Sequence, residues 1–309
     1  MRHNLIVTGV CGHIGSGILS RLDRFPESSV IGVDSMRTLR YASIFRVRNF
    51  RFIEGDVRRS LDRLPSEKYT ALFHLAAITD AEKSTEIADE VRNNNLESTQ
   101  KACEFCLERN IPLIFPSSTS VYGSQESQVD EDCSVSQLRP QSPYAETKLQ
   151  EEKTVHYFRE KGLRCVILRL ATIAGPSQGM RFHTAVNKFC WQAAQGQSVT
   201  VWKTALHQKR PYLALEDCVE AFLRASHALQ TLNVPEVVNV VTQNHTVDEI
   251  LEMIRRRCPR LRIEMTESRI MNQLSYEVVS KYSKTIGFAA AGSIERCISE
   301  TLDVLPPAP

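Results

Sequence analysis

The chain has 309 residues, enough for one large domain or for a core domain with a smaller partner. Hydrophobic residues make up 42% and charged residues 24%, and the formal net charge of +2 gives no electrostatic reason to expect nucleic acid or an anionic membrane as a partner. No apolar run approaches the roughly 20 residues of a membrane helix, and the N-terminal segment lacks the pattern of a signal peptide. We therefore expect a cytoplasmic protein that binds neither nucleic acid nor membrane.

Cysteines and histidines give no reason to expect a metal. The nine cysteines are scattered, and the CxxC formed by Cys103 and Cys106 lies in a helical stretch without a second pair. A buried helix face is favoured there over zinc or redox chemistry. The eight histidines show no HxxxH or comparable spacing. The sequence predicts no metal site.

Short apolar runs alternate with amphipathic stretches through the first half of the chain. The runs lack polar alternation, as expected of strands buried on both faces of a parallel sheet. Helical spacing appears around residues 14–22, 91–107 and 144–161. This order predicts an α/β fold with a Rossmann-type doubly wound parallel sheet. The expected strands are 4–7, 30–33, the region of 52–53, 71–75, 112–115 and 165–170.

The second half is less regular. A helix is expected at 182–195, a strand at 199–202 and a helix at 217–229. Thr246 opens TVDE, a capping-box pattern for a further helix, and the tail predicts a last helix. We expect a Rossmann core at 1–170 and a smaller mixed α/β lobe made mainly from 171–309, with some segments returning to the core.

A glycine-rich loop, TGVCGHIG from Thr8 to Gly15, separates the first predicted strand from the first helix. Glycine suits this position because the backbone must turn tightly and approach a pyrophosphate closely. The helix N-terminus then offers free N–H groups and a partial positive charge to phosphates. Loops are glycine-rich for many reasons, but strand, loop and helix follow here in the order of a dinucleotide site.

Asp34 ends the second predicted strand, about 20 residues beyond the glycine loop, where an acid binds the adenosine ribose hydroxyls. A carboxylate would repel a 2′-phosphate, so NAD is favoured over NADP as the cofactor. The alternative is that Asp34 is only a turn residue at a strand end.

Tyr144 and Lys148 stand at i and i+4 in YAETK, on one helix face. A phenol has a pKa of about 10, and lowering it to near 7 takes roughly 4 kcal/mol. A neighbouring ammonium and a positive nicotinamide ring can supply that stabilisation. Two solvated residues would be the ordinary interpretation of the pair. Its place after the fifth strand, downstream of a dinucleotide motif and of the hydroxyl cluster PSSTSVYG, favours catalysis.

Together these motifs resemble the extended short-chain dehydrogenases/reductases of the NAD-dependent epimerase/dehydratase family, whose members act mainly on nucleotide sugars. The resemblance covers nearly the whole chain. TGVCGHIG resembles TGxxGxxG, and Gly55-Asp56-Val57 resembles the adenine-contacting GD[IV] segment. The segment at 75–77 resembles the stretch beneath the cofactor, and Asn95 resembles the asparagine of NVxGT.

The resemblance implies site residues of three kinds: catalytic, cofactor-binding and substrate-binding. Ser118 completes a catalytic triad with Tyr144 and Lys148. Cofactor contacts are expected from Gly9, Gly12, His13, Ile14, Asp34, Asp56, Val57, Leu75, Ala76, Ala77, Asn95, Tyr144 and Lys148. Substrate contacts are expected from Thr79, Ser118, Thr119, Thr172, Arg181, Asn187 and Arg210.

Three of the substrate predictions have different support. Arg210 in RPYLALED resembles the arginine that contacts the sugar-nucleotide diphosphate in RDYxHVxD. Arg181 and Asn187 lie in a stretch expected to line the pocket, although a surface-helix position is an equal alternative. Arg269 is a weaker candidate for a second diphosphate ligand.

The chain departs from the family pattern at several positions. Thr119 and Ser120 stand where sugar 4,6-dehydratases carry Asp-Glu, and elimination of water needs that acid and base. Dehydratase activity is therefore disfavoured. Thr172 replaces a frequent asparagine, Ala214 a frequent histidine and Ser98 the glycine of NVxGT, which puts the sugar contacts in doubt rather than the cofactor or the triad.

We predict a nucleotide-sugar epimerase that acts through a transient keto-sugar on a UDP- or other NDP-hexose, and C4 is the favoured position. The family resemblance favours a homodimer built from helices that include those of Asn95 and Tyr144. The resemblance implies that Tyr144 removes a hydroxyl proton as the carbon is oxidised by NAD. One alternative is net oxidation or reduction of a nucleotide sugar with the same residues. A less favoured alternative is a non-catalytic dinucleotide sensor. The base, the sugar and the carbon inverted stay open.

Overall fold

The computed structural model describes residues 3–45, 47–79, 87–123, 128–267 and 276–306. Its centre is a seven-stranded parallel sheet in the order β11-β7-β5-β4-β1-β2-β3. The predicted Rossmann-type fold is thereby confirmed. The strands are β1 (Asn4–Thr8), β2 (Ser29–Asp34), β3 (Phe50–Glu54), β4 (Ala71–His74), β5 (Leu113–Ser118), β7 (Cys165–Leu170) and β11 (Val237–Val240).

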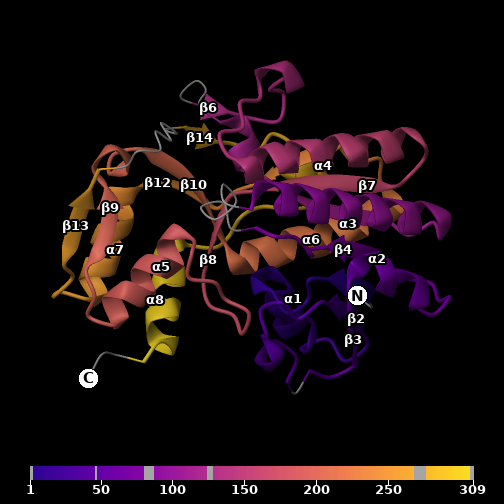
Figure 1. The fold of residues 1–309 in the computed structure, drawn as a ribbon, viewed down its shortest axis with the longest axis horizontal. Helices are drawn as coiled ribbons and strands as arrows, with labels where there is room; N and C mark the ends of the chain where they lie inside the picture. Colours follow the sequence, from indigo (N-terminus) through magenta and orange to yellow (C-terminus); the bar gives the residue numbers. More distant parts are fainter. Residues whose placement is uncertain (1–2, 46, 80–86, 124–127, 268–275, 307–309) are drawn as a thin grey trace.

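Helices cover both faces of this sheet (Figure 1). The apolar cluster on one face includes residues of α1 (His13–Leu22) and α6 (Leu215–Thr231). The cluster on the other face includes residues of α2 (Val57–Ser60), α3 (Ala88–Glu108) and α4 (Pro143–Glu160). The sheet strands other than the edge strand β3 are largely buried between these clusters, which explains why their sequences are mostly continuous apolar runs.

A smaller lobe lies to the left of the core in Figure 1 and has an apolar cluster of its own. It contains three helices and several short strands. These are α5 (Ala185–Ala194), α7 (Val247–Arg257), α8 (Ile294–Val304), β8 (Thr172–Ala174), β9 (Val199–Trp202), β10 (Lys209–Ala214), β12 (Gln243–Thr246) and β13 (Ile263–Thr266). A two-stranded pair, β6 (Gln128–Val129) and β14 (Glu277–Val278), links the middle of the chain to its end.

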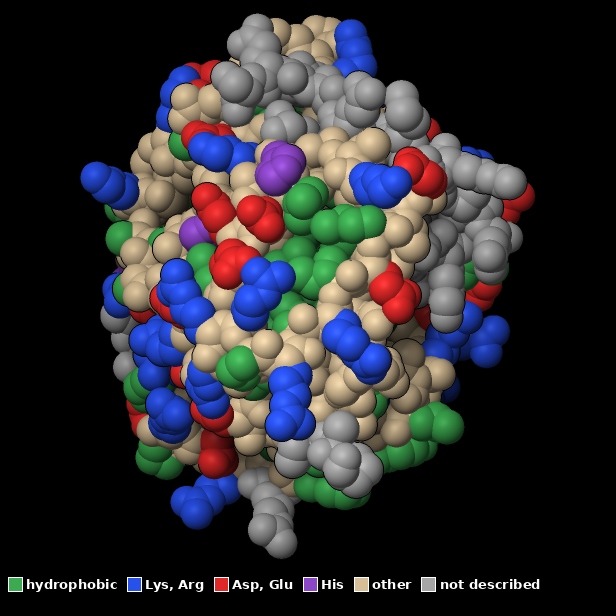
Figure 2. Space-filling view, turned by 90° about the vertical axis from the view of Figure 1, so that its left-hand side faces the viewer, with side chains coloured by type: hydrophobic (Ala, Val, Ile, Leu, Met, Phe, Trp, Pro, Cys, Tyr) green, Lys and Arg blue, Asp and Glu red, His purple; other side chains and the backbone are tan. Residues whose placement is uncertain are grey.

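The outer face of the lobe mixes both signs of charge. Figure 2 shows Lys and Arg side chains interspersed with Asp and Glu around a hydrophobic area. Arg256 pairs with Glu295, and Arg257 pairs with Asp303, so α7 is tied to α8 by surface ion pairs. Such a mixed surface gives no single-sign field that would attract a polyanion.

Chain order and spatial order differ beyond residue 170. β11 returns to the sheet beside β7, and α6 packs on the face that also carries α1. β10 lies between β8 and β12 in a separate three-stranded sheet. Since β1 and β4 are neighbours while β2 and β3 extend the other way, the strand order reverses next to β1, and ligands of such sheets bind at that point.

Candidate active site

The glycine loop lies at the carboxyl end of β1, at the reversal point of the sheet. Gly9 has φ +65, and a Cβ there would lie 2.6 Å from the backbone nitrogen of Ala76. A Cβ on Gly15 would lie 2.4 Å from the carbonyl oxygen of Val10, inside the turn that begins α1. Space therefore requires glycine at both positions, and at Gly9 the backbone conformation requires it as well.

The N-terminus of α1 is suited to an anion. Its N-cap is Gly12, which offers no capping side chain, and its first turn contains no acidic residue. The N–H groups and the partial positive charge of the helix thus meet no competing carboxylate from its own first turn. Ile14 in that turn packs against the apolar core.

The His13 side chain connects the glycine loop to a distant segment of the chain through a hydrogen bond. Its Nε2 lies 2.8 Å from the carbonyl oxygen of Gly175, and burial lowers its pKa to about 4. The ring is therefore neutral near pH 7 and can donate to that carbonyl. His13 joins the start of α1 to the loop that leads toward the smaller lobe.

Asp34 connects the end of β2 to the glycine loop. One carboxylate oxygen accepts from the backbone N–H of Cys11 at 3.0 Å, and the other accepts from Met36 at 2.9 Å. Each carboxylate oxygen has a second lone pair, so these bonds leave acceptor capacity for ribose hydroxyls. Asp34 therefore holds the backbone after β2 and the backbone of the glycine loop together. Arg40 lies nearby, where burial lowers its pKa and the charge of Asp34 opposes that shift.

The remaining cofactor predictions divide into side-chain and backbone roles. Asp56 caps α2 by accepting from the N–H of Arg58 at 2.9 Å, and the Arg58 guanidinium lowers its pKa. Val57 is buried beneath that turn. Leu75, Ala76 and Ala77 follow β4, and the N–H of Ala76 donates to Thr8 Oγ1 at 3.2 Å.

Asn95 holds the segment after β4 in place. It is fully buried on α3, its Oδ1 accepts from the N–H of Ile78 at 2.9 Å, and its Nδ2 donates to the carbonyl oxygen of Ile78 at 3.0 Å. One side chain thus satisfies both backbone groups of the same residue. Asn95 shapes the wall of the predicted cofactor site through Ile78.

The catalytic candidates come together at the carboxyl edge of the sheet. Ser118 ends β5, and its Oγ accepts from the N–H and the hydroxyl of Ser120 at 3.2 and 2.9 Å. Tyr144 and Lys148 lie in the first turns of α4, which begins after the N-cap Ser142 with Pro143 at its first position. Ser118 lies close enough to Tyr144 for hydrogen bonding between them to lower the pKa of the Tyr144 hydroxyl.

The electrostatics of Tyr144 combine opposing effects. Burial raises the pKa of its hydroxyl above the ordinary value, while the charges of Lys148 and Arg181 and the hydrogen bond with Ser118 lower it. Burial is the largest of these effects, so Tyr144 is protonated near neutral pH. A further positive charge at the site would favour the phenolate.

Two predicted substrate residues, Arg181 and Thr79, meet in the structure. The guanidinium of Arg181 donates to Thr79 Oγ1, although the residues come from distant segments. The Arg181 charge also acts on both Tyr144 and His13, so this arginine lies between the catalytic pair and the glycine loop. Its position suits an anionic ligand.

Asn187 is fully buried on α5, so the surface-helix alternative does not hold for it. Its Oδ1 accepts from the N–H of Gly175, and its Nδ2 donates to the carbonyl oxygen of Arg181, both at 3.3 Å. Asn187 therefore fixes the backbone of the loop that presents Arg181. Thr172 lies half-buried in β8, in register with Tyr212 of β10.

Arg210 and Thr119 are connected through Tyr276, a residue that no motif of the sequence singled out. The Tyr276 hydroxyl donates to the carbonyl oxygen of Thr119 at 3.0 Å. Arg210 lies close enough for its charge to oppose the burial that raises the Tyr276 pKa to about 12, and it donates to Gln208 at 3.0 Å. The Thr119 side chain is buried, and the contact with Tyr276 is made by the Thr119 backbone carbonyl. Arg269 lies outside the described residues.

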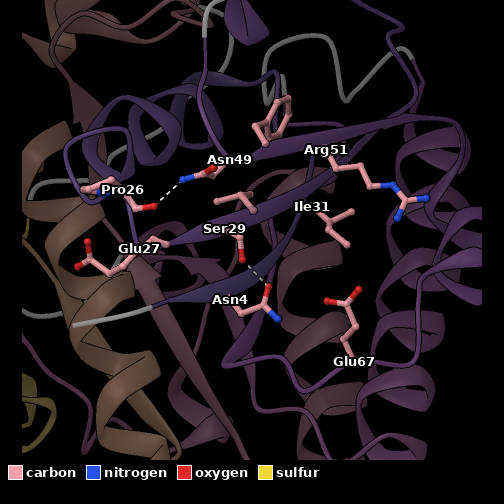
Figure 3. Close-up of a pocket in the computed structure, with 11 residues that line it drawn as sticks. Asn4, Pro26, Glu27, Ser29, Ile31, Asn49, Arg51 and Glu67 are labelled. Carbon is pink, nitrogen blue, oxygen red and sulfur yellow. Dashed lines mark hydrogen bonds between the residues drawn. The ribbon is translucent and has the colours of Figure 1, made fainter.

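A cavity of about 660 Å³ lies elsewhere, at the amino ends of β1, β2 and β3 (Figure 3). Its polar groups bond to one another: Ser29 donates to Asn4 Oδ1 at 2.8 Å, and Asn49 donates to the carbonyl oxygen of Pro26. Ligands of parallel sheets bind at the opposite, carboxyl end.

The described residues contain no group of three or more His, Cys, Asp or Glu side chains that could hold a metal ion. Across the ranges given above, no helix is long and apolar enough to cross a membrane.

Comparison with known proteins gives consistent matches. Over residues 5–240 the chain matches the family model described as the NAD dependent epimerase/dehydratase family. It is 30% identical to an uncharacterized UDP-glucose epimerase of Bacillus subtilis, over 74% of this chain and 76% of the relative. It is 28% identical to a trifunctional UDP-glucose 4,6-dehydratase/3,5-epimerase/reductase of Arabidopsis thaliana over 97% of this chain, yet spans only 46% of that relative.

A solved structure extends the match to three dimensions. The UDP-glucuronic acid 4-epimerase of Bacillus cereus, determined in complex with UDP-4-deoxy-4-fluoro-glucuronic acid and NAD, superposes with a TM-score of 0.84 at 25% identity, covering 97% of this chain and 98% of that one. The fold, the ordered motifs and the family model agree along most of the sequence. The chain belongs to the NAD dependent epimerase/dehydratase family.

Proposed function

We propose that this protein is an NAD-dependent epimerase that inverts a nucleotide sugar at C4. The observation that carries the proposal is the convergence of Ser118, Tyr144 and Lys148 at the carboxyl edge of the sheet, the edge on which the glycine loop also lies, with hydroxyl residues at 119 and 120. The absence of carboxylates at these two positions argues against elimination of water. The names of the Bacillus relatives support a UDP-sugar as substrate class.

NAD is the cofactor that the family implies, and this chain fits it. Gly9 leaves room for a close backbone approach, the uncapped start of α1 offers N–H groups to the pyrophosphate, and Asp34 has acceptor capacity for the ribose. We propose that 1–170, with α6 and β11, hold NAD, and that most of 171–309 contacts the sugar nucleotide. NAD bound there would supply a hydride acceptor for the sugar carbon and, in its reduced form, a hydride donor for the keto-sugar.

The chain itself supplies proton transfer and positioning. In the oxidation half-reaction Tyr144 Oη, as phenolate, takes the proton of the C4 hydroxyl, and in the reduction half-reaction it gives that proton back to the same oxygen. Ser118 Oγ hydrogen-bonds this oxygen and keeps it near Tyr144. Lys148 and Arg181 favour the phenolate by their positive charge.

The substrate diphosphate needs cationic ligands, and the proposal assigns Arg210 and Arg181 to that role. Arg210 lies in the smaller lobe, and Arg181 lies between the glycine loop and Tyr144. Thr79, Thr119 and Thr172 are assigned to the sugar side of the pocket. The keto-sugar formed by oxidation must turn over within this space before it is reduced on its other face.

The test is incubation of purified protein with UDP-glucose, UDP-glucuronic acid and UDP-N-acetylglucosamine without added NAD. An epimerase that retains its cofactor gives the C4-inverted sugar, detected by anion-exchange chromatography and NMR. Accumulation of keto-sugar or of NADH would instead show net oxidation and overturn epimerisation. Mass spectrometry of ligands that co-purify under native conditions would name the cofactor and the nucleotide.

We also propose a cytoplasmic homodimer in which α3 and α4 of two copies pack together. Family resemblance supports the interface, and these two helices lie side by side along one face of the core (Figure 1). Light scattering coupled to size-exclusion chromatography tests it. A mass near twice 35.0 kDa is expected.

A further inference from the structure

A buried carboxylate faces the catalytic lysine from the next turn of its own helix. Glu151 Oε2 lies 3.1 Å from Lys148 Nζ, and the two side chains are only 1% and 4% exposed. Thr99 on α3 donates to the other oxygen, Oε1, at 2.7 Å. Glu151 therefore connects α3 to the lysine that the proposed reaction uses.

The lysine is held from several directions. Its Nζ donates to the carbonyl oxygen of Pro116 in β5 at 3.1 Å and lies 4.8 Å from the centre of the Phe115 ring. An ammonium has three protons, so the contacts to Glu151 and Pro116 leave one for a ligand or for the side of Tyr144. The position of the Lys148 ammonium is thus set by partners from its own helix and from β5.

Glu151 itself depends on this ion pair. Its Oε2 makes no regular hydrogen bond to the described residues, so the Lys148 ammonium is its compensating group. A buried charge deprived of its partner is strongly destabilising, and this holds for either member of the pair. The pair is therefore coupled in stability as well as in charge.

The titratable groups around Tyr144 and around the Lys148–Glu151 pair carry different charges. Lys148 and Arg181 lower the Tyr144 pKa, and Glu151 raises it. On β4, His74 is kept neutral by burial, which lowers its pKa to about 3, with Lys148 adding to the shift. On α3, burial raises the pKa of the Cys103 thiol far above neutrality. Glu151 is the negative charge in this set.

We propose that Glu151 is a positioning residue that anchors the Lys148 ammonium and weakens the positive field that Lys148 exerts on the Tyr144 hydroxyl. The inference rests on the proposed function for the meaning of Tyr144 and Lys148, and it assigns to Glu151 no contact with the substrate. In chemical terms, Glu151 makes Tyr144 a weaker acid and its phenolate a stronger base, so that the phenolate takes the proton of the sugar hydroxyl more readily in the oxidation half-reaction.

The first test measures the ionisation of Tyr144 directly in cofactor-free protein. Tyrosine is labelled with ¹³C at Cζ, and the Tyr144 resonance is assigned by its loss in Tyr144→Phe. In Glu151→Gln the onset of the Tyr144 ionisation shift should come about one pH unit lower, as for a roughly tenfold stronger acid, and it is compared over the pH range in which circular dichroism shows both proteins folded. Glu146→Gln, at an exposed position of the same helix, is the matched control. An equal shift in both variants, or none in Glu151→Gln, overturns the proposal.

The second test measures thermal unfolding, so a variant of low stability still gives an informative melting temperature. Lys148→Met should lower the melting temperature because Glu151 is left buried and unpaired. Adding Glu151→Gln to Lys148→Met should raise it again. If Glu151→Gln lowers the melting temperature equally in the wild-type protein and in the Lys148→Met variant, the two residues are not coupled and the anchoring role is wrong.

Activity gives a third, separate measurement. In Glu151→Gln the rising limb of the pH–rate profile should move to lower pH by the same amount as the Tyr144 ionisation. If the wild-type protein shows no epimerase activity, the proposed function fails while the NMR and unfolding results still decide the role of Glu151. If activity is present but its profile stays unmoved when the Tyr144 ionisation moves, Glu151 has no effect on the reaction.

Discussion

Glu152 accepts two hydrogen bonds from the guanidinium of Arg169, at 2.9 Å from Nε and 2.7 Å from a terminal nitrogen, and both side chains are buried. The pair joins α4 to β7. The Arg169 guanidinium also lies 5.0 Å from the ring centre of Tyr122. Because α4 carries Tyr144 and Lys148, this bidentate contact fixes the helix on which the proposed chemistry depends.

Breaking that pair should be costly. We expect Glu152→Ala to lower the free energy of unfolding by about 3–5 kcal/mol, since Arg169 would keep a buried charge without its partner. Urea unfolding followed by circular dichroism measures the loss. Glu252→Ala removes one member of an exposed pair with Arg255 and should cost no more than about 1 kcal/mol. Similar losses in both variants would contradict a special role for the buried pair.

Removal of the Tyr144 hydroxyl should eliminate proton transfer without disturbing the fold. Tyr144→Phe is expected to reduce kcat by about 10²–10⁴-fold, the usual contribution of a general acid–base group. Initial rates with the best nucleotide sugar give this value, and melting temperature checks folding. Tyr157→Phe, half-exposed on the same helix, is the control and should retain full activity. Retention of activity in Tyr144→Phe would remove Tyr144 from the mechanism.

The cofactor loop can be tested at Gly9. Gly9→Ala adds a Cβ at 2.6 Å from the nitrogen of Ala76 and also forces alanine to φ +65. We expect it to weaken NAD binding at least tenfold in calorimetry. Gly162→Ala has φ +100 with nothing within 4 Å of the new Cβ, so it carries conformational strain without a clash. It should cost about 1 kcal/mol of stability and leave NAD affinity unchanged. If Gly9→Ala and Gly162→Ala bind NAD equally well, the backbone at Gly9 does not approach the bound NAD closely.

Buried tyrosines should make the protein sensitive to alkali. Burial raises the pKa of Tyr122, Tyr212 and Tyr276 to about 12, against about 10 in an unfolded chain. A group whose folded pKa is raised contributes stability that is fully present below its unfolded pKa and is lost as pH rises through the folded pKa. Each tyrosine should thus cost up to about 2.7 kcal/mol between pH 10 and 12.

Urea unfolding at pH 9 to 12 measures this loss. Tyr212→Phe removes one titrating group, so its stability should fall less steeply over the same interval than that of the wild type. Tyr157→Phe, on an exposed part of α4, should follow the wild-type curve. A flat curve for the wild type would mean that these tyrosines ionise in the folded state as they do in the unfolded one.

Local sequence predicted the parts of this protein that depend on near neighbours. The apolar runs identified the first strands of the sheet because strands buried on both faces need continuous apolar side chains. The glycines of the loop marked the turn into α1, and Tyr144 and Lys148 share a helix face through their spacing alone. The capping box of α7 was likewise visible, since Thr246 and Glu249 lie three residues apart and form it in the structure.

Tertiary structure decided what depends on partners far along the chain. β11 enters the core sheet, β10 pairs with β8 and β12, and Asn187 is buried against the loop that carries Arg181. None of these follows from a local pattern, because strand pairing and side-chain burial are set by contacts between distant segments. Glu151 is the sharpest case. The sequence gives its spacing from Lys148. Its burial depends on the packing of α3 and β5 against α4, and the coupling of the two charges depends on that burial.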